Sequence, residues 1–303
     1  METVLKTVGL SKKYGSRYVV RGVNMKINKG DIYGFIGKNG AGKTTFMRVI
    51  LGLSEPTEGS FELFGGISRE EAGRKTGALI EAPGIYPNCT AKENMKRFAL
   101  LKGADANSID GILEFVGLGD VGNKKAGKFS LGMKQRLGIA VALLGDPEFL
   151  VLDEPVNGLD PTGIFEVREL LQRLNKDDGV TILISSHLLA ELQKLATCYG
   201  VIEGGKLVKE MRQSDLEELC RPYIKVVVDD LKIALNVVVE NYHAHDFEIL
   251  PYNTLALYDL SKDIPQVAKM FSDANVTVLS INSCQGDLES TFISLMGGIK
   301  NEQ

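Results

Sequence analysis

Residues 37–44 read Gly-Lys-Asn-Gly-Ala-Gly-Lys-Thr, which fits the phosphate-loop pattern G-x-x-x-x-G-K-[S/T]. In such a loop the glycines let the backbone wrap so that its N–H groups point inward at phosphate oxygens. A β-branched run ends just before the loop at residue 36, and a helical pattern, FMRVILGL, occupies residues 46–53. This order of strand, loop and helix predicts an α/β fold that binds an anion at the helix N-terminus.

The pattern also assigns roles within the loop. Lys43 is expected to reach the β- and γ-phosphates of a nucleotide, and Thr44 to place its hydroxyl on Mg²⁺. The other expected contacts are Gly37, Lys38, Asn39, Gly40, Ala41, Gly42 and Thr45. The pattern arises by chance about once in a hundred chains of this length, so a plain glycine-rich turn is the less favoured interpretation.

A pair of carboxylates follows the apolar run Phe149–Leu152. Adjacent buried carboxylates are costly unless a cation or a proton accompanies them. Asp153 is therefore expected to hold Mg²⁺, and Glu154 to take a proton from the attacking water or to polarise it. Taken alone, an Asp-Glu pair after a strand is more often a helix cap or a solvated turn. The phosphate loop earlier in the chain favours the catalytic interpretation.

A second apolar run, residues 181–184, ends in the same way, at Ser185-Ser186-His187. Polar residues that gather at the carboxyl ends of buried strands mark the binding edge of a doubly wound parallel sheet. We therefore expect both polar clusters to meet at one edge of such a sheet.

Residues 129–140 read FSLGMKQRLGIA and come about 20 residues before Asp153. This segment resembles the signature of the ABC ATPases, which implies that Ser130 and Gly132 cap the γ-phosphate of an ATP held by the opposite subunit. Leu131 and Met133 stand where Gly and Gln are usual in that family. Without the resemblance, the segment is an N-capped amphipathic helix.

Further matches to the family follow in the expected order over residues 1–220. Tyr14 matches the aromatic residue that stacks on adenine, and His187 the histidine that reads the γ-phosphate. Residues 157–160, Asn-Gly-Leu-Asp, match a loop that contacts the other subunit. Each of these patterns alone is more often structural, whereas the ordered set favours the family roles.

One position departs from the family pattern. Glu81 stands in the loop that links the nucleotide to the membrane partner, where Gln is usual. Because a carboxylate can approach Mg²⁺, Glu81 is a candidate ligand of metal and nucleotide. Unlike the amide of Gln, it cannot donate a hydrogen bond to position water. Together with the signature and an acidic C-terminal extension, this Glu resembles the ATP-binding subunits of bacitracin-resistance and lantibiotic-immunity exporters.

The resemblance implies an ATPase that uses ATP and Mg²⁺, pairs with a second ATP-binding subunit, which we expect to be another copy, and powers separate permease subunits. It implies a cytoplasmic protein held peripherally at the inner face of the membrane. The alternative is a non-transport ABC ATPase acting on nucleic acid, ribosomes or iron–sulfur assembly. Against it stand the single nucleotide-binding domain and the absence of a long heptad insertion between Lys43 and Ser130.

Composition supports these expectations. The 303 residues carry a formal net charge of −4, and residues 221–303 hold 6 Lys and Arg against 11 Asp and Glu. A nucleic-acid binder usually has the opposite balance, so none is expected as a partner. The chain has no apolar run of about 18 residues and no signal-peptide core at its start, so it is not expected to insert into a membrane. The four scattered cysteines are expected to be reduced thiols.

We expect two domains. Residues 1–220 are predicted to form the ABC-type P-loop domain, with a mostly parallel sheet, an antiparallel N-terminal sheet and a helical subdomain near residues 90–115. Residues 221–303 are predicted to form a small α+β domain of ferredoxin-like order, βαββαβ. Its strands are expected at 223–228, 246–250, 254–258 and 276–282, and its helices at 231–242, 263–273 and 287–297.

Overall fold

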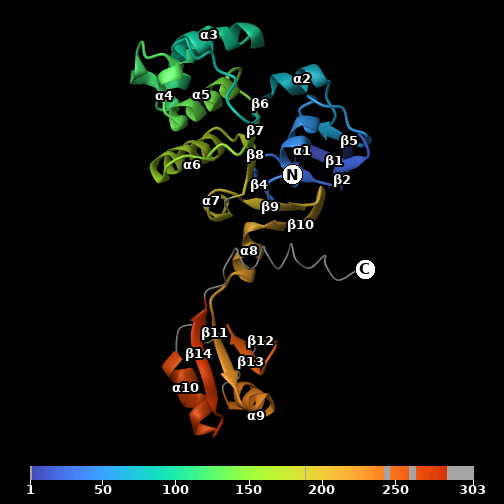
Figure 1. The fold of residues 1–303 in the computed structure, drawn as a ribbon, viewed down its shortest axis with the longest axis vertical. Coiled ribbons are helices and arrows are strands. Elements are labelled where there is room, and N and C mark those ends of the chain that lie inside the picture. Colours follow the sequence, from blue (N-terminus) through green and yellow to red (C-terminus); the bar gives the residue numbers. More distant parts are fainter. Residues whose placement is uncertain (1, 188, 242–245, 259–263, 285–303) are drawn as a thin grey trace. The chain divides into compact units, whose positions relative to one another are not determined.

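The computed structural model describes residues 2–187, 189–241, 246–258 and 264–284 (Figure 1). The chain divides into two compact units, Met1–Gln213 and Ser214–Gln303. The division falls at the start of the helix Gln213–Leu219 (α8), a few residues before the expected boundary after residue 220.

A six-stranded sheet forms the centre of the first unit, in the order β10-β9-β4-β8-β7-β6. All neighbours run parallel except β9 and β10. Every residue of β4, β7 and β8 is buried, as expected for parallel strands covered on both faces. The mostly parallel sheet is thus confirmed. Its strands are β4 (Ile32–Ile36), β6 (Thr76–Leu79), β7 (Phe149–Asp153), β8 (Thr181–Ser186), β9 (Cys198–Glu203) and β10 (Lys206–Arg212).

The antiparallel N-terminal sheet is also present. In it β1 pairs with β2, β3 and β5. The β-branched run from Tyr18 to Ile27 forms parts of two strands, which are separated at Asn24. The Asn24 side chain accepts a hydrogen bond from Gly9 N at 2.8 Å and so bridges the break. The strands are β1 (Thr3–Tyr14), β2 (Arg17–Val23), β3 (Lys26–Asn28) and β5 (Glu58–Leu63).

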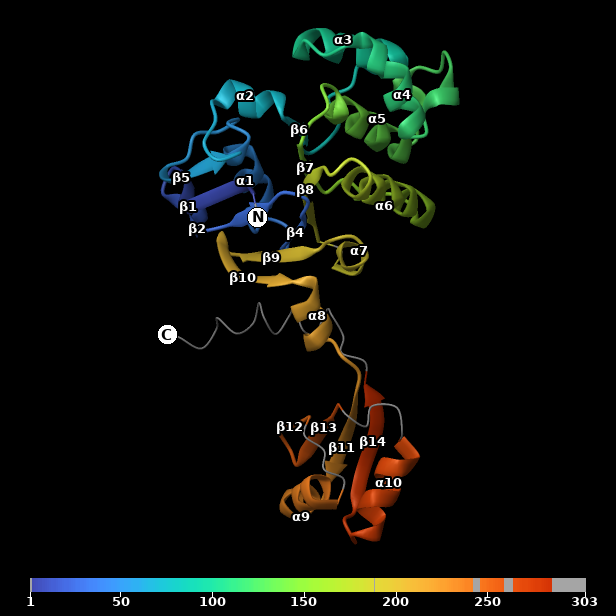
Figure 2. The same cartoon turned by 180° about the vertical axis from the view of Figure 1, so that it is seen from behind.

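The helices of the first unit cover both faces of the six-stranded sheet. The helix α1 and the N-terminal sheet lie on one face, and α5, α6 and α7 lie on the other (Figures 1 and 2). The predicted helical subdomain corresponds to α3 and α4, which pack with α5 beyond β6. The bounds are α1 (Lys43–Ile50), α2 (Arg69–Arg74), α3 (Ala91–Lys102), α4 (Ile109–Phe115), α5 (Leu131–Leu143), α6 (Pro161–Lys176) and α7 (Leu189–Gln193).

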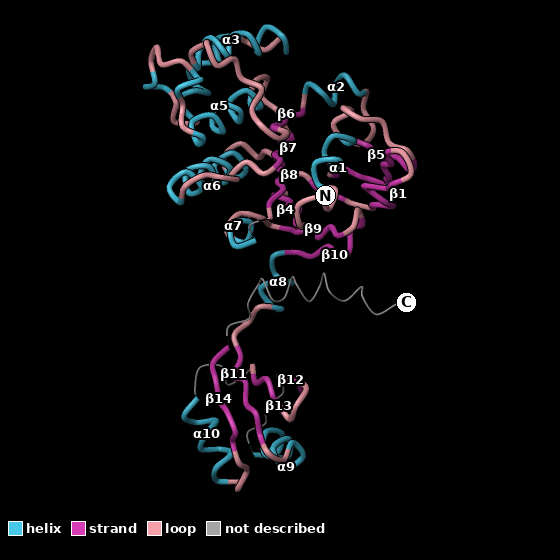
Figure 3. The backbone as a smooth tube through the Cα atoms, in the orientation of Figure 1, coloured by secondary structure: helices cyan, strands magenta, loops and turns pink. Residues whose placement is uncertain are grey.

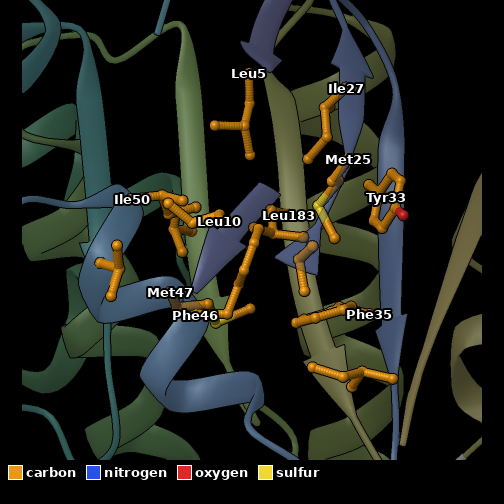
Figure 4. Close-up of a cluster of buried hydrophobic side chains, with 14 of the residues drawn as sticks. Leu5, Leu10, Met25, Ile27, Tyr33, Phe35, Phe46, Met47, Ile50 and Leu183 are labelled. Carbon is orange, nitrogen blue, oxygen red and sulfur yellow. The ribbon is translucent and has the colours of Figure 1, made fainter. Parts of the chain in front are cut away.

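The main core of the first unit fills the space between α1, the N-terminal sheet and the six-stranded sheet (Figure 4). Phe35 of β4 and Phe46 of α1 meet there with ring centroids 5.2 Å apart. This packing fixes α1 against the sheet, so the loop that precedes the helix is held at the sheet edge. Side chains of this core include Leu5, Leu10, Met25, Ile27, Tyr33, Met47, Ile50 and Leu183.

The second unit contains a four-stranded antiparallel sheet in the order β12-β13-β11-β14 (Figure 3). With α9 between β11 and β12, and α10 between β13 and β14, this is the predicted ferredoxin-like βαββαβ arrangement. Its own core joins both helices to the sheet through residues such as Val226, Leu257 and Phe271. The expected helix at 287–297 lies outside the described residues. The elements are β11 (Tyr223–Val228), α9 (Leu231–Asn236), β12 (Phe247–Leu250), β13 (Thr254–Leu257), α10 (Ile264–Asp273) and β14 (Val278–Cys284).

All four cysteines lie in described segments as free thiols, and burial raises the pKa of the Cys198 thiol to about 12. Over the part of the chain that the structure describes, no helix combines the length and the apolar character needed to cross a membrane.

Candidate active site

The phosphate loop joins β4 to α1 and depends on its glycines for space. A Cβ at Gly37 would lie 2.5 Å from the carbonyl oxygen of Ile202 on β9. At Gly42, which is the N-cap of α1, a Cβ would lie 2.6 Å from the Val19 oxygen, and the backbone φ is +111°. Residues with a side chain rarely adopt such a φ, and at both positions a Cβ would collide with a neighbouring carbonyl oxygen. The structure therefore explains why the loop has glycine at these two positions.

The tight packing gives a first prediction. Gly37→Ala is expected to cost about 1–3 kcal/mol of stability, because the new methyl group must displace the backbone of β9. Thermal unfolding of the nucleotide-free protein measures this loss. The matched control is Gly73→Ala in α2, where a Cβ meets no atom within 4 Å and a gain of about 0.5–1 kcal/mol is expected. Equal melting temperatures for the two variants would contradict the packing argument.

Lys43 begins α1, and its side chain turns back into the loop. Its Nζ donates to the carbonyl oxygen of Gly37 at 2.5 Å and lies 3.2 Å from Glu154 Oε1. Only 6% of the side chain is exposed. A buried ammonium needs such partners, and they hold the charge inside the loop, where phosphate oxygens would bind.

Thr44 and Asp153 meet where α1 faces the end of β7. The Thr44 hydroxyl donates to Asp153 Oδ2 at 2.7 Å, and Ser185 Oγ on β8 donates to Asp153 Oδ1 at 2.6 Å. Asp153 is almost wholly buried. Both of these hydrogen bonds come from neutral hydroxyls, so the structure brings a buried carboxylate and a hydroxyl together at the predicted metal position.

Glu154 follows Asp153 with a φ of +50°, an uncommon value for a residue with a side chain. Its backbone N–H donates to Ser185 Oγ at 2.9 Å. Its carboxylate lies between Lys43 and the ring of His187, whose Nδ1 is 2.7 Å from Glu154 Oε2. The two catalytic candidates at the ends of β7 and β8 are thus in direct contact, beside the loop lysine.

Glu81 lies two residues beyond β6, with a φ of +61°. Its Oε1 accepts a hydrogen bond from Arg48 Nη2 at 2.9 Å, and both side chains are about half exposed to solvent. The structure therefore gives Glu81 a cationic partner on α1. Its expected contacts with metal and nucleotide stay a prediction.

The signature segment is placed on the other face of the sheet from α1. Ser130 is the N-cap of α5, and its Oγ accepts a hydrogen bond from Met133 N at 3.2 Å. A Cβ at Gly132 would meet only a side-chain atom of Leu159, at 3.7 Å. In the contacts described for this chain, neither Ser130 nor Gly132 touches the phosphate loop, so a single chain does not bring the two halves of the expected site together.

Tyr14 closes β1 and is half exposed, with Lys12 Nζ 5.1 Å from the centroid of its ring. An exposed aromatic ring at a strand end is open to stacking by a flat ligand. The loop at residues 157–160 ends at Asp160, which is the N-cap of α6 and accepts a hydrogen bond from Gly163 N at 2.8 Å.

Known proteins are similar to this chain over nearly its whole length. A family model described as ABC transporter matches residues 20–157. The bacitracin transport ATP-binding protein BcrA of Bacillus licheniformis is 43% identical over 98% of this chain and 99% of its own length. This chain belongs to the ABC transporter family. It is an ATP-binding subunit of that family, an ATPase that drives transport.

Other comparisons agree with this assignment. The lantibiotic transport ATP-binding protein SrtF of Streptococcus pyogenes is 44% identical over 71% of this ABC subunit and 94% of its own length. A solved dimeric ATP-binding cassette in a post-hydrolysis state, bound to ADP and Pi, is 25% identical, with a TM-score of 0.62. The structural match covers 69% of this chain and 98% of the cassette. The non-transport alternative is not favoured, because the full-length relatives carry transport names.

Two sets of side-chain contacts at the site in this ABC subunit were not predicted from its sequence. The Ser185 hydroxyl donates a hydrogen bond to the Asp153 carboxylate and accepts one from the backbone N–H of Glu154. The Arg48 guanidinium donates a hydrogen bond to the Glu81 carboxylate. Ser185 was expected at this edge of the sheet as a member of the polar cluster 185–187, but its contacts with Asp153 and Glu154 were not predicted. Arg48 carries no such signal, since a basic residue in the last turn of a helix is common.

Proposed function

We propose that two copies of this ABC subunit bind two ATP molecules between them and hydrolyse them with Mg²⁺. In each site Lys43, Thr44, Asp153 and Glu154 come from one copy, and Ser130 and Gly132 come from the other. The observation that carries this proposal is the contact of Thr44 with Asp153 and of Lys43 with Glu154, which joins the phosphate loop to the carboxyl edge of β7.

The donor set fits a magnesium ion. Mg²⁺ prefers oxygen ligands and commonly uses one or two carboxylates together with substrate phosphates. The hydroxyl of Thr44 and the buried carboxylate of Asp153 are oxygen donors held 2.7 Å apart, and a cation would offset the cost of burying that carboxylate. When bound, the ion would neutralise charge on the phosphates. Ser185 fixes the orientation of Asp153.

Glu154 is the group proposed to accept a proton from the attacking water. Its contacts with Lys43 and His187 hold the carboxylate in one position, which favours general-base action. His187 is proposed to orient Glu154 in the free protein and to approach the γ-phosphate in the complex. Tyr14, exposed at the end of β1, is proposed to stack on the adenine.

The opposite copy completes the site through the start of α5. Backbone N–H groups at a helix N-terminus favour anions, and the open space at Gly132 allows a phosphate to approach the backbone closely. Because Ser130 and the phosphate loop do not touch within one chain, the γ-phosphate contact is proposed to form only between copies.

We further propose that the subunit powers the export of a peptide antibiotic of the bacitracin type, through permease subunits that hold it at the inner face of the membrane. The bacitracin transport relatives match 98% of this chain, so the match extends into the second unit. The lantibiotic transport relative matches 216 residues only. This difference in coverage favours a bacitracin-type substrate over a lantibiotic.

Deleting the gene tests the export proposal. We expect the deletion strain to become several-fold more sensitive to bacitracin, with full recovery on expression of the wild-type chain and none on expression of Lys43→Ala. The measurement is the minimal inhibitory concentration across a panel of peptide antibiotics. Unchanged susceptibility across the panel would overturn the substrate class and leave the ATPase proposal standing.

A further inference from the structure

Two side-chain contacts join α1 to the carboxyl edge of the parallel sheet. Thr44 bonds Asp153 at the end of β7, and Arg48 bonds Glu81 beyond the end of β6. Thr44 and Arg48 are four residues apart on α1, which places them on one face of the helix, about 6 Å apart along its axis. The Arg48–Glu81 pair therefore lies one helical turn away from the proposed metal ligands.

The register of the sheet places Glu81 on the same edge as Asp153. The strands β6 and β7 are parallel neighbours, and Leu79 is the partner of Leu152. Glu81 follows Leu79 by two residues, and Asp153 follows Leu152 by one. The two carboxylates thus follow the ends of adjacent strands. Asp153 accepts a hydrogen bond from the first turn of α1, and Glu81 accepts one from its last turn.

We propose that Arg48 is a positioning residue that keeps the Glu81 carboxylate away from the metal position in the nucleotide-free subunit. When Mg-ATP binds, the Arg48–Glu81 ion pair breaks and the carboxylate is free to approach the metal ion. This inference rests on the proposed function. The guanidinium and the metal ion compete for one carboxylate, so Arg48 raises the Mg²⁺ concentration that the site requires.

The character of the ion pair suits such an exchange. Side-chain exposures of 43% for Arg48 and 59% for Glu81 mean that water screens the pair, so a doubly charged ion can displace the arginine. Arginine stays charged at every physiological pH, so the competition does not depend on protonation. A glutamine at position 81 would carry no charge for Arg48 to pair with. The proposed competition between Arg48 and the metal ion therefore requires the glutamate.

The test is Mg²⁺-dependent binding of the fluorescent analogue mant-ATP to the full-length protein, measured by anisotropy. Arg48→Gln is expected to lower the Mg²⁺ concentration at half-maximal binding by about two- to fivefold, the scale expected for loss of an exposed ion-pair partner. Arg48→Lys, which keeps the positive charge, is expected to stay close to the wild type.

A double substitution separates this mechanism from a general effect on α1. In a Glu81→Gln background, Arg48→Gln is expected to cause no further change in the Mg²⁺ midpoint. Arg69→Gln, which breaks the exposed Arg69–Glu55 pair on other elements, is the control and is expected to leave the midpoint unchanged. Melting temperatures of all variants confirm that each is folded.

Three results would overturn the inference: an unchanged midpoint in Arg48→Gln, an equal shift in the Glu81→Gln background, or wild-type binding that needs no Mg²⁺. None of these three results would contradict the proposed function. The proposed function would fail if Lys43→Ala still hydrolysed ATP.

Discussion

Replacing Glu154 with glutamine is expected to lower ATP turnover by about 10²–10⁴-fold, the usual contribution of a positioned general base. The amide has the same shape as the carboxylate but cannot accept a proton from water. It also loses the charge that pairs with the buried ammonium of Lys43 at 3.2 Å. Nucleotide binding is expected to persist, because the loop, Thr44 and Asp153 are unchanged.

Phosphate release under saturating Mg-ATP measures this effect, and binding of mant-ATP shows that the site is still occupied. The matched control is Glu148→Gln, one residue before β7, where the carboxylate pairs only with exposed lysines among the ion pairs described. Its turnover is expected to equal that of the wild type. Turnover of Glu154→Gln within a few-fold of the wild type would remove Glu154 from the proposed role.

Lys43→Ala is expected to weaken ATP binding by about 10–100-fold, because the loop loses a charge-assisted hydrogen bond to the phosphates. Hydrolysis is expected to fall below detection, since the same ammonium would neutralise charge at the transferred phosphate. The substitution also removes the cationic partner of Glu154, so the melting temperature of the nucleotide-free protein is expected to fall.

Isothermal titration with ATP and a phosphate-release assay check this prediction. Lys75→Ala is the control, because Lys75 is partly exposed and pairs with Glu148 at 3.0 Å, outside the proposed site. Retained turnover in Lys43→Ala would show that residues 37–44 are not the reaction site.

The parts of the site that the sequence predicts are the local ones. The phosphate loop is a continuous segment whose glycines meet requirements visible within eight residues. The carboxylates of β7 follow a buried strand, which periodicity reveals. The contacts made by Ser185 and Arg48 join segments far apart in the chain, and only the packing of β6, β7, β8 and α1 brings them together.

Two features of the fold were not predicted from the sequence. The hydrophobic pattern alone does not show the break between β2 and β3, where the backbone N–H of Gly9 on β1 donates to the Asn24 side chain at 2.8 Å. The helix α6 was not among the predicted elements, although Asp160 followed by Pro161 is a strong helix start. In the second unit, each described strand lies within a few residues of its predicted range.

The proposed two-copy site is the central claim, and light scattering of Glu154→Gln tests it most directly. If Ser130 and Gly132 of one copy close the ATP site of the other, saturating Mg-ATP should double the molar mass of this variant. The double variant Glu154→Gln with Ser130→Arg should remain at the mass of one chain. A mass that stays at about 33 kDa for Glu154→Gln with ATP bound would contradict the two-copy site.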